Sequence, residues 1–160
     1  MVSQAQRFKS QYVCVTGGEP LAQPNCLLLL TALCDVGFTV SLETSGAMDI
    51  SQVDKRVHIV MDLKTPASGE MNKNCYENIP LLAKKDQIKF VLCDRQDYDW
   101  AVFKIDEFQL GKTVGDIFFS PSYGQVKAEN IAQWILDDKL LSVRLQTQLH
   151  KTLWGDKPGV

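Results

Sequence analysis

Short apolar runs alternate with longer segments of helical periodicity along the chain. The apolar runs predict strands at residues 13–15, 38–42, 57–63, 86–93, 117–119 and 142–149. Helices are expected at residues 25–36 and 96–110, and in the segment that places Ala128, Ile131 and Ile135 on one face. Because strands alternate with helices, we expect an α/β domain with a parallel sheet and with helices outside it.

Three segments carry more particular expectations. Residues 1–11 are polar and predict a helix end or a frayed start, and residues 67–80 predict a loop with at most one helical turn. The helix at residues 25–36 is apolar nearly all round. We therefore expect it to be buried between the sheet and another layer, and to end at Gly37.

The first strand leads into a turn that most side chains would obstruct. Gly17 and Gly18 allow positive φ and leave main-chain groups open to a ligand. Glu19 places a carboxylate at the strand end, and Pro20 disfavours a helical conformation for Glu19. A tight turn without any ligand is the alternative. A phosphate-binding turn is disfavoured, because Glu19 would repel phosphate.

Composition limits the class of protein. With 160 residues, of which 45% are hydrophobic, we expect residues 1–160 to form one domain with its own core. The net charge of -2, with basic and acidic residues spread along the chain, predicts no nucleic-acid partner and no membrane association. The ligand is therefore expected to be small. The first residues lack the apolar core of a signal peptide, so a cytoplasmic location is expected.

The five cysteines do not predict a disulfide framework or a local metal site. Their number is odd, and each lies in or near an apolar element, where a free thiol acts as a small hydrophobe. No pair has CxxC spacing, and no cysteine and histidine have the spacing of a zinc finger. The five positions are Cys14, Cys26, Cys34, Cys75 and Cys93.

Polar residues follow every expected strand. The strand ends read TGGEP, ETSG, DLKTP, LCDR, SPSYG and LHK. Ordinary turns also favour serine, aspartate and glycine, so each cluster alone has a structural explanation. All strands of a parallel sheet point the same way, however, so these clusters are expected at one edge of the sheet. We therefore expect the functional site there.

These segments resemble the 7-carboxy-7-deazaguanine synthases, radical S-adenosylmethionine (SAM) enzymes of queuosine biosynthesis. VTGGEP after a strand, then SLETSG, DLKTP, QIKFV, SPSYGQV and QLHKTLWGDKPG, carry the resemblance over nearly the whole chain. GGEP is shared by many radical SAM enzymes, whereas DLKTP with QLHKxLWG points to this family. The implied fold is a partial TIM-like barrel, and the implied assembly is a homodimer.

The resemblance also implies a reaction. 6-Carboxy-5,6,7,8-tetrahydropterin would lose ammonia to give 7-carboxy-7-deazaguanine. In the family a 4Fe-4S cluster receives an electron from a reductant such as flavodoxin and reduces SAM. The resulting 5'-deoxyadenosyl radical abstracts hydrogen from the substrate, and Mg²⁺ assists.

The cluster ligands of the family have no counterpart here. Such enzymes place cluster cysteines upstream of GGEP, and no cysteine precedes Cys14. We therefore expect the first strand, the cluster loop and its helix to be missing, and Mg²⁺ to have been bound near that loop. Cys14 and Cys26 are 12 residues apart and are expected to be core thiols. No catalytic or metal-binding residue is assigned, and this chain alone is expected to be inactive.

The first SAM contacts implied by the resemblance lie in the first two strand ends. Gly17, Gly18 and Glu19 would receive the amino group of SAM, since carbonyl oxygens and a carboxylate suit an ammonium ion. Thr44 and Ser45 resemble a second SAM contact. The alternative for both is a turn stabilised by their own hydroxyls.

The remaining SAM contacts lie farther along the chain. Lys64 would meet the carboxylate of SAM, with Asp62 beside it among the cofactor contacts. The alternative is a solvated lysine or an ion pair with Asp62. Ser120, Ser122 and Tyr123 would line the adenosine end, and a proline-containing turn is their alternative explanation.

Two residues are implied as substrate contacts. Thr16 would bind the pterin, although a threonine at a strand end often only caps a turn. His150 would contact the carboxylate or the ring of the substrate.

Two further classes of function compete with the synthase. One is a SAM-binding or purely structural remnant without catalysis, which the missing cluster loop favours. The other is a nucleotide-binding α/β domain that uses the glycine pair as a phosphate turn, which Glu19 disfavours.

Overall fold

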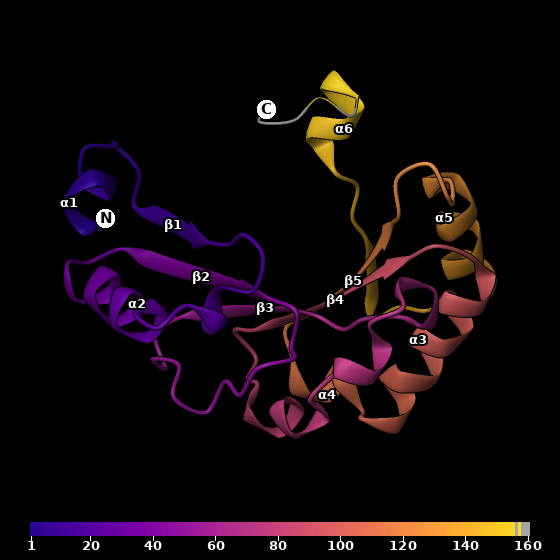
Figure 1. Cartoon of the computed structure of the whole chain (residues 1–160). Helices are drawn as coiled ribbons and strands as arrows, with labels where there is room; N and C mark the ends of the chain where they lie inside the picture. Colours follow the sequence, from indigo (N-terminus) through magenta and orange to yellow (C-terminus); the bar gives the residue numbers. More distant parts are fainter. Residues whose placement is uncertain (156, 158–160) are drawn as a thin grey trace.

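A computed structural model describes residues 1–155 and residue 157, without the side chains of residues 150 and 152. Its centre is one six-stranded parallel sheet, in which the spatial order of the strands follows the sequence from β1 to β6 (Figure 1). The strands are β1 (Tyr12–Val15), β2 (Thr39–Thr44), β3 (His58–Asp62), β4 (Gln87–Leu92), β5 (Asp116–Pro121) and β6 (Val143–Leu145). The predicted α/β class and parallel sheet are thus confirmed. The sheet is open, with β1 and β6 at its edges. The partial TIM-like barrel stays a prediction.

Helices cover the outer face of the curved sheet. Figure 1 shows α2, α3, α4 and α5 on the convex side, whereas α6 stands apart on the other side. The helices are α1 (Val2–Ala5), α2 (Cys26–Asp35), α3 (Arg95–Glu107), α4 (Leu110–Thr113), α5 (Ala128–Asp137) and α6 (Leu149–Trp154). Short 3₁₀ helices lie at Pro20–Ala22, Pro66–Ser68, Met71–Lys73 and Tyr76–Leu81.

The core lies between the sheet and these helices. Alternate strand residues such as Leu42, Met61 and Phe90 are fully buried beneath the helices. The residues between them, such as Glu43 and Lys89, are only partly buried. Because the strands alternate in this way, the sheet has one apolar face toward the helices and one mixed polar face.

The turn after β1 has the predicted conformation. Gly17 and Gly18 have φ of 105° and 58°, and Glu19 is extended at φ -117° and ψ 103°. An added Cβ on either glycine would meet nothing within 4 Å, so it is the positive φ that favours glycine there. Gly37 ends α2 with φ 92°, also as predicted.

Two helix predictions need correction. Helix α2 is not buried between two layers, because Leu28 is 71% exposed and only one face of the helix packs on the sheet. The helix predicted at residues 96–110 is confirmed as α3, but it ends at Glu107, and a separate helix, α4, begins at Leu110. Gln109, with φ 49°, separates the two, since a left-handed residue interrupts helical hydrogen bonding.

Two other segments also differ from the sequence reading. The last strand ends at Leu145. The Gln146 N–H makes the final bond to the sheet, at 2.8 Å from the Phe119 carbonyl, and α6 begins at Leu149. The loop expected at residues 67–80 contains three short 3₁₀ helices rather than one turn at most. Hydrogen bonds from side chains hold this segment against the strand ends.

Cys14 is not a core thiol. It is exposed, because it points to the open face of the edge strand β1, whereas Cys26 and Cys34 are buried as expected. All five thiols are free. Within the described residues, no helix is long and apolar enough to cross a membrane.

Gly115 tests the packing between β4 and β5. A Cβ at Gly115 would collide with the carbonyl oxygen of Lys84, whereas one at Gly111, four residues earlier in α4, would make ordinary contacts with Ser142. We expect Gly115→Ala to lower the free energy of unfolding by about 1–3 kcal/mol, as measured by urea denaturation. The control Gly111→Ala should be neutral or stabilising by up to about 1 kcal/mol. Equal stabilities for the two variants would contradict this packing.

Candidate functional site

Two adjoining cavities lie at the carboxyl ends of the strands. The first has a volume of about 180 Å³ and is lined by Thr16, Gly17, Gly18, Glu43, Thr44, Ser45, Asp62 and Lys64. The second has a volume of about 290 Å³, and its lining includes Asp62, Lys64, Thr65, Ala67, Cys93, Ser122 and Gln125. Asp62 and Lys64 belong to both cavities. The structure therefore brings residues from five strand ends to one place, as the parallel topology predicted.

Glu19 joins the ends of β1 and β2. Its two carboxylate oxygens accept hydrogen bonds from the Thr44 hydroxyl at 2.9 and 3.0 Å, and from the Ser45 N–H at 2.8 Å. The Ser45 hydroxyl and the Leu21 N–H also donate to it. In this structure the carboxylate is occupied by the protein, so Glu19 positions the two turns. The groups of this turn that remain open are the main chains of Gly17 and Gly18.

The hydroxyls of Thr44 and Ser45 also stabilise the turn after β2, which is the structural role that the sequence offered as the alternative to a SAM contact. The Thr44 hydroxyl accepts a bond from the Gly46 N–H at 3.2 Å, and the Ser45 hydroxyl accepts one from the Ala47 N–H at 3.4 Å. Thr44 is buried, whereas Ser45 is half-buried. Both residues line the first cavity, so they combine a structural role with access to a ligand.

Asp62 and Lys64 form an ion pair between the two cavities. Lys64 Nζ lies 2.9 Å from Asp62 Oδ2. This ion pair is the alternative role that the sequence offered for Lys64. The other oxygen, Asp62 Oδ1, is buried and has no hydrogen-bond partner among the described residues. A buried carboxylate oxygen without a donor is costly. A ligand donor in the adjoining cavities would satisfy it.

The predicted adenosine contacts are not all together. Ser122 lines the second cavity, and Ser120 is buried in β5 below it. Tyr123 is exposed and lines a separate cavity of about 210 Å³, where Lys151 lies 5.0 Å from its ring centre. Its role at the adenosine end stays a prediction. The side chain of His150 lies outside the described part of the chain, so its role is also open.

Several polar residues of this region were missed by sequence reading. Glu43 and Lys89 form an ion pair of 3.1 Å on the open face of the sheet. Asn74, Asn78 and Asp97 bind the main chains of the strand-end loops. Strand alternation in ETSG could have placed Glu43 opposite to Thr44. Asn74 and Asn78 lie in a segment without strong periodicity, and Asp97 lies near the start of a predicted helix. No sequence signal marked these three residues.

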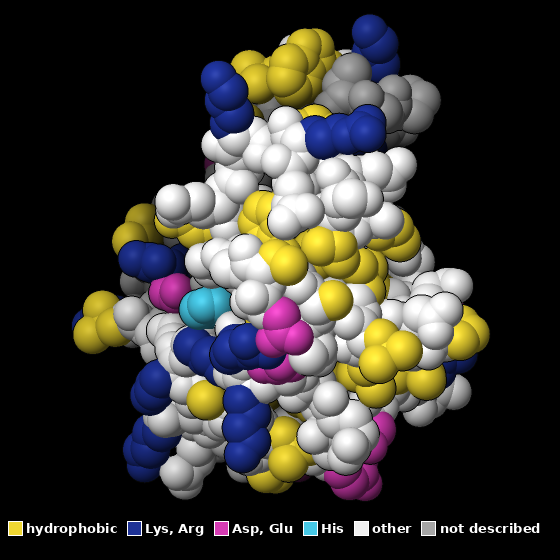
Figure 2. All heavy atoms as spheres, turned by 90° about the vertical axis from the view of Figure 1, so that its left-hand side faces the viewer, with side chains coloured by type: hydrophobic (Ala, Val, Ile, Leu, Met, Phe, Trp, Pro, Cys, Tyr) yellow, Lys and Arg dark blue, Asp and Glu magenta, His cyan; other side chains and the backbone are white. Residues whose placement is uncertain are grey.

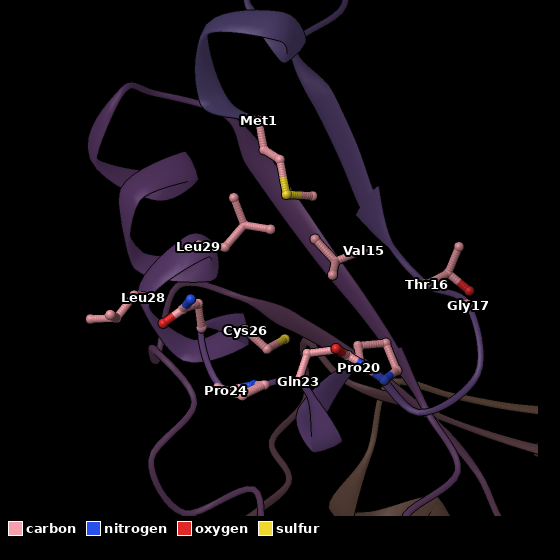
Figure 3. A pocket seen from close by; sticks show the side chains of 11 residues that line it. Met1, Val15, Thr16, Gly17, Pro20, Gln23, Pro24, Cys26, Leu28 and Leu29 are labelled. Carbon is pink, nitrogen blue, oxygen red and sulfur yellow. The ribbon is translucent and has the colours of Figure 1, made fainter.

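A larger cavity lies on the other side of the first turn and is mostly apolar. Its volume is about 570 Å³, and it shares only Thr16 and Gly17 with the predicted site. Figure 3 shows the side chains of Met1, Val15 and Leu29 converging on it. It offers few polar groups for a charged ligand. The polar strand-end cavities are therefore the better candidate site.

The described residues do not fit an iron–sulfur cluster or another metal centre. No group of three or more cysteine, histidine or acidic side chains is arranged to hold a metal within residues 1–155 and 157. Burial raises the pKa of Cys26, Cys34 and Cys93. A raised pKa disfavours the thiolate, which is the form that binds a metal.

Sequence comparison shows the family. A 7-carboxy-7-deazaguanine synthase from Chlorobaculum tepidum is 42% identical over 158 residues, which cover 96% of this chain and 70% of that protein. This chain belongs to the 7-carboxy-7-deazaguanine synthase family. Synthases of the same name from Koribacter versatilis and Thermoplasma acidophilum are 36% and 34% identical, over 88% and 95% of this chain and 67% and 71% of theirs. A scan against family profiles finds no match.

The fold of this 7-carboxy-7-deazaguanine synthase family member is similar to that of solved SuiB structures. Streptococcus suis SuiB bound to SAM matches with a TM-score of 0.64 at 15% identity, over 92% of this chain and 40% of SuiB. SuiB bound to its precursor peptide SuiA matches with a TM-score of 0.58 at 16% identity, over 91% of this chain and 42% of that one. At these identities the likeness concerns the fold alone.

Thr44 tests the contact between the first two strand ends in this family member. Thr44→Val removes the hydroxyl that donates to Glu19, and leaves a half-buried carboxylate with fewer donors. We expect unfolding to become easier by about 1–3 kcal/mol in thermal or chemical denaturation. Thr39→Val, in the exposed first position of β2, is the matched control and should change stability by less than about 0.5 kcal/mol. A Thr44→Val variant as stable as the control would show that this contact contributes little.

Proposed function

We propose that this chain carries the SAM-binding and substrate-binding edge of a 7-carboxy-7-deazaguanine synthase. The reaction is the ring contraction of 6-carboxy-5,6,7,8-tetrahydropterin to 7-carboxy-7-deazaguanine, with release of one ammonia and no net oxidation. Family membership supports the reaction, and the SAM-bound neighbour with the same fold supports the ligand. Within the wider pathway such a product serves the synthesis of queuosine for tRNA.

One observation carries the site assignment: the buried, unpartnered Asp62 Oδ1 between two adjoining polar cavities. SAM offers the donors that this oxygen lacks, in its ammonium group and its ribose hydroxyls. Gly17 and Gly18 are exposed and line the first cavity, where their carbonyl oxygens suit the same ammonium. The residues present therefore fit SAM.

Charge also supports this orientation of SAM. Lys64 is about one third exposed and reaches both cavities, so it is accessible to the carboxylate of the methionine end. Ser122 lines the larger cavity, and its hydroxyl suits a ribose. Thr16 lies at the lip of the first cavity, beside the half-buried pair of Glu43 and Lys89. The pterin would bind on this open face of the sheet.

The cluster and Mg²⁺ are implied by the family, but the described residues do not fit them. No described residue is therefore assigned as a ligand of the cluster or of Mg²⁺. The homodimer and the reductant likewise follow from the family alone. What this chain supplies is the binding and orientation of SAM and of the pterin.

A second function is favoured by the lack of a fitting ligand set among the described residues. In this alternative the chain binds SAM at the same edge without converting it. Both functions predict SAM binding, and only the first predicts product.

Calorimetric titration of SAM into the purified chain tests the site. We expect Lys64→Ala to weaken SAM binding about tenfold to a hundredfold, because one charged partner of the SAM carboxylate is lost. Lys55→Ala is the matched control, since Lys55 is an exposed lysine before the start of β3 and should leave affinity unchanged. Equal affinities of the two variants would show that SAM does not use Lys64.

A chimera tests the reaction. This chain is substituted for the part of the Chlorobaculum tepidum synthase that it matches, and the product is assayed anaerobically with reductant, SAM, Mg²⁺ and 6-carboxytetrahydropterin. We expect 7-carboxy-7-deazaguanine and ammonia in equal amounts. A chimera that cleaves SAM but leaves the pterin intact would contradict the substrate. One that binds SAM without cleaving it would favour the second function.

A further inference from the structure

Lys64 lies where the sheet stops supplying hydrogen bonds. The preceding residue, Leu63, still donates its N–H to the Lys89 carbonyl on β4 at 3.0 Å. Lys64 itself comes after the last ladder position of β3. A lysine side chain is long and flexible, so its ammonium is placed accurately only if its main chain is fixed.

Asn74 takes the place of a neighbouring strand for Lys64. Its side-chain Oδ1 accepts the Lys64 N–H at 2.9 Å, and its Nδ2 donates to the Lys64 carbonyl at 2.9 Å. One amide side chain thus satisfies both main-chain groups of Lys64. The next residue, Cys75, donates its N–H to the Gly46 carbonyl at 3.0 Å. The same segment therefore connects the loop after β3 to the turn after β2.

Asp97 holds the other end of the Lys64 loop. Its carboxylate is fully buried near the start of α3, yet it binds outside its own helix. Oδ1 accepts the Ala67 N–H at 2.9 Å, and Oδ2 accepts the Thr65 hydroxyl and the Cys93 N–H, both at 2.9 Å. All three of these partners line the second cavity. Three donors satisfy the carboxylate, which compensates for its burial.

We propose that Asn74 and Asp97 are positioning residues that fix Lys64 for its ligand. Neither residue lines the two cavities. Asn74 acts on the main chain of Lys64 itself, and Asp97 acts on the residues that follow Lys64. The inference rests on the proposed function, because it names residues that prepare the same SAM site. It requires that their removal affect SAM binding through Lys64, and not through the fold in general.

Amide exchange followed by NMR tests the first half of the proposal without any ligand. In Asn74→Ala, the Lys64 amide should exchange about threefold to tenfold faster, because it loses its acceptor. The Leu63 amide, which is bonded within the sheet, should not change. Asn72→Ala is the matched control, since Asn72 is an exposed asparagine in the same segment. An unchanged Lys64 amide in Asn74→Ala would overturn the proposal.

A double-mutant cycle tests the second half. Calorimetry gives the SAM affinities of the unchanged chain and of the Asn74→Ala, Lys64→Ala and doubly substituted chains. We expect Asn74→Ala to weaken binding about threefold to tenfold on its own, and by less than about twofold when Lys64 is already alanine. Two independent losses that simply multiply would overturn the proposal, because Asn74 would then act on SAM binding without Lys64.

Asp97→Asn is the second variant. It keeps the shape of the side chain but presents an NH₂ group to donors, so the Ala67 and Cys93 amides should exchange faster. If Asp97→Asn does not fold, the Asn74 cycle decides alone. If the unchanged chain binds no SAM, the proposed function fails, whereas the exchange of the Lys64 amide still decides whether Asn74 holds that loop.

Discussion

The whole site depends on one constraint: six parallel strands end at the same edge of the sheet and lose their main-chain partners there. Each loop that follows must find other hydrogen-bond partners. In this chain polar side chains provide them. Glu19 joins the turns after β1 and β2, Asn74 and Asn78 reach the loops after β2 and β3, and Asp97 joins the loops after β3 and β4. The site is the space that these contacts leave open.

This arrangement separates two kinds of polar residue. One kind is saturated by the protein, such as Asp97 with three donors and Glu19 with four donor groups on its two oxygens. The other kind is left incomplete, as are the main chains of the glycine pair and Asp62 Oδ1. Only the second kind is free to bind a ligand. The distinction matters because Glu19, the most conspicuous carboxylate of the sequence motif, belongs to the first kind in this structure.

Exposed apolar side chains mark the other end of the chain. Leu149, Leu153 and Trp154 of α6 are more than half exposed. Figure 2 shows apolar side chains at the top of the molecule, where α6 lies away from the sheet. The alternating pattern at residues 142–149 resembled a strand, but only Val143–Leu145 finds a partner in β5. After the bond from the Gln146 N–H to the Phe119 carbonyl, the chain leaves the sheet, and α6 begins at Leu149.

The sequence predicted what local rules and topology determine. Apolar runs predicted the strands, the glycine pair predicted the turn, and strand direction predicted that the polar ends would meet. It could not predict contacts that depend on three-dimensional placement. Asn74 lies in a segment without periodicity, and Asp97 looked like an ordinary residue of a helix start. The exposure of Cys14 and Leu28 also depends on what packs beside β1 and α2, which a pattern of apolar residues does not specify.

Amide chemical shifts of the labelled chain during a titration with SAM test the central claim most directly. If SAM binds at the strand-end edge, the amides of Gly17, Gly18, Ser45 and Lys64 should shift together with one dissociation constant. The amide of Gly115, at the opposite end of the sheet, should not shift. Shifts confined to the apolar cavity around Met1 and Leu29, with the strand-end amides unchanged, would contradict the account.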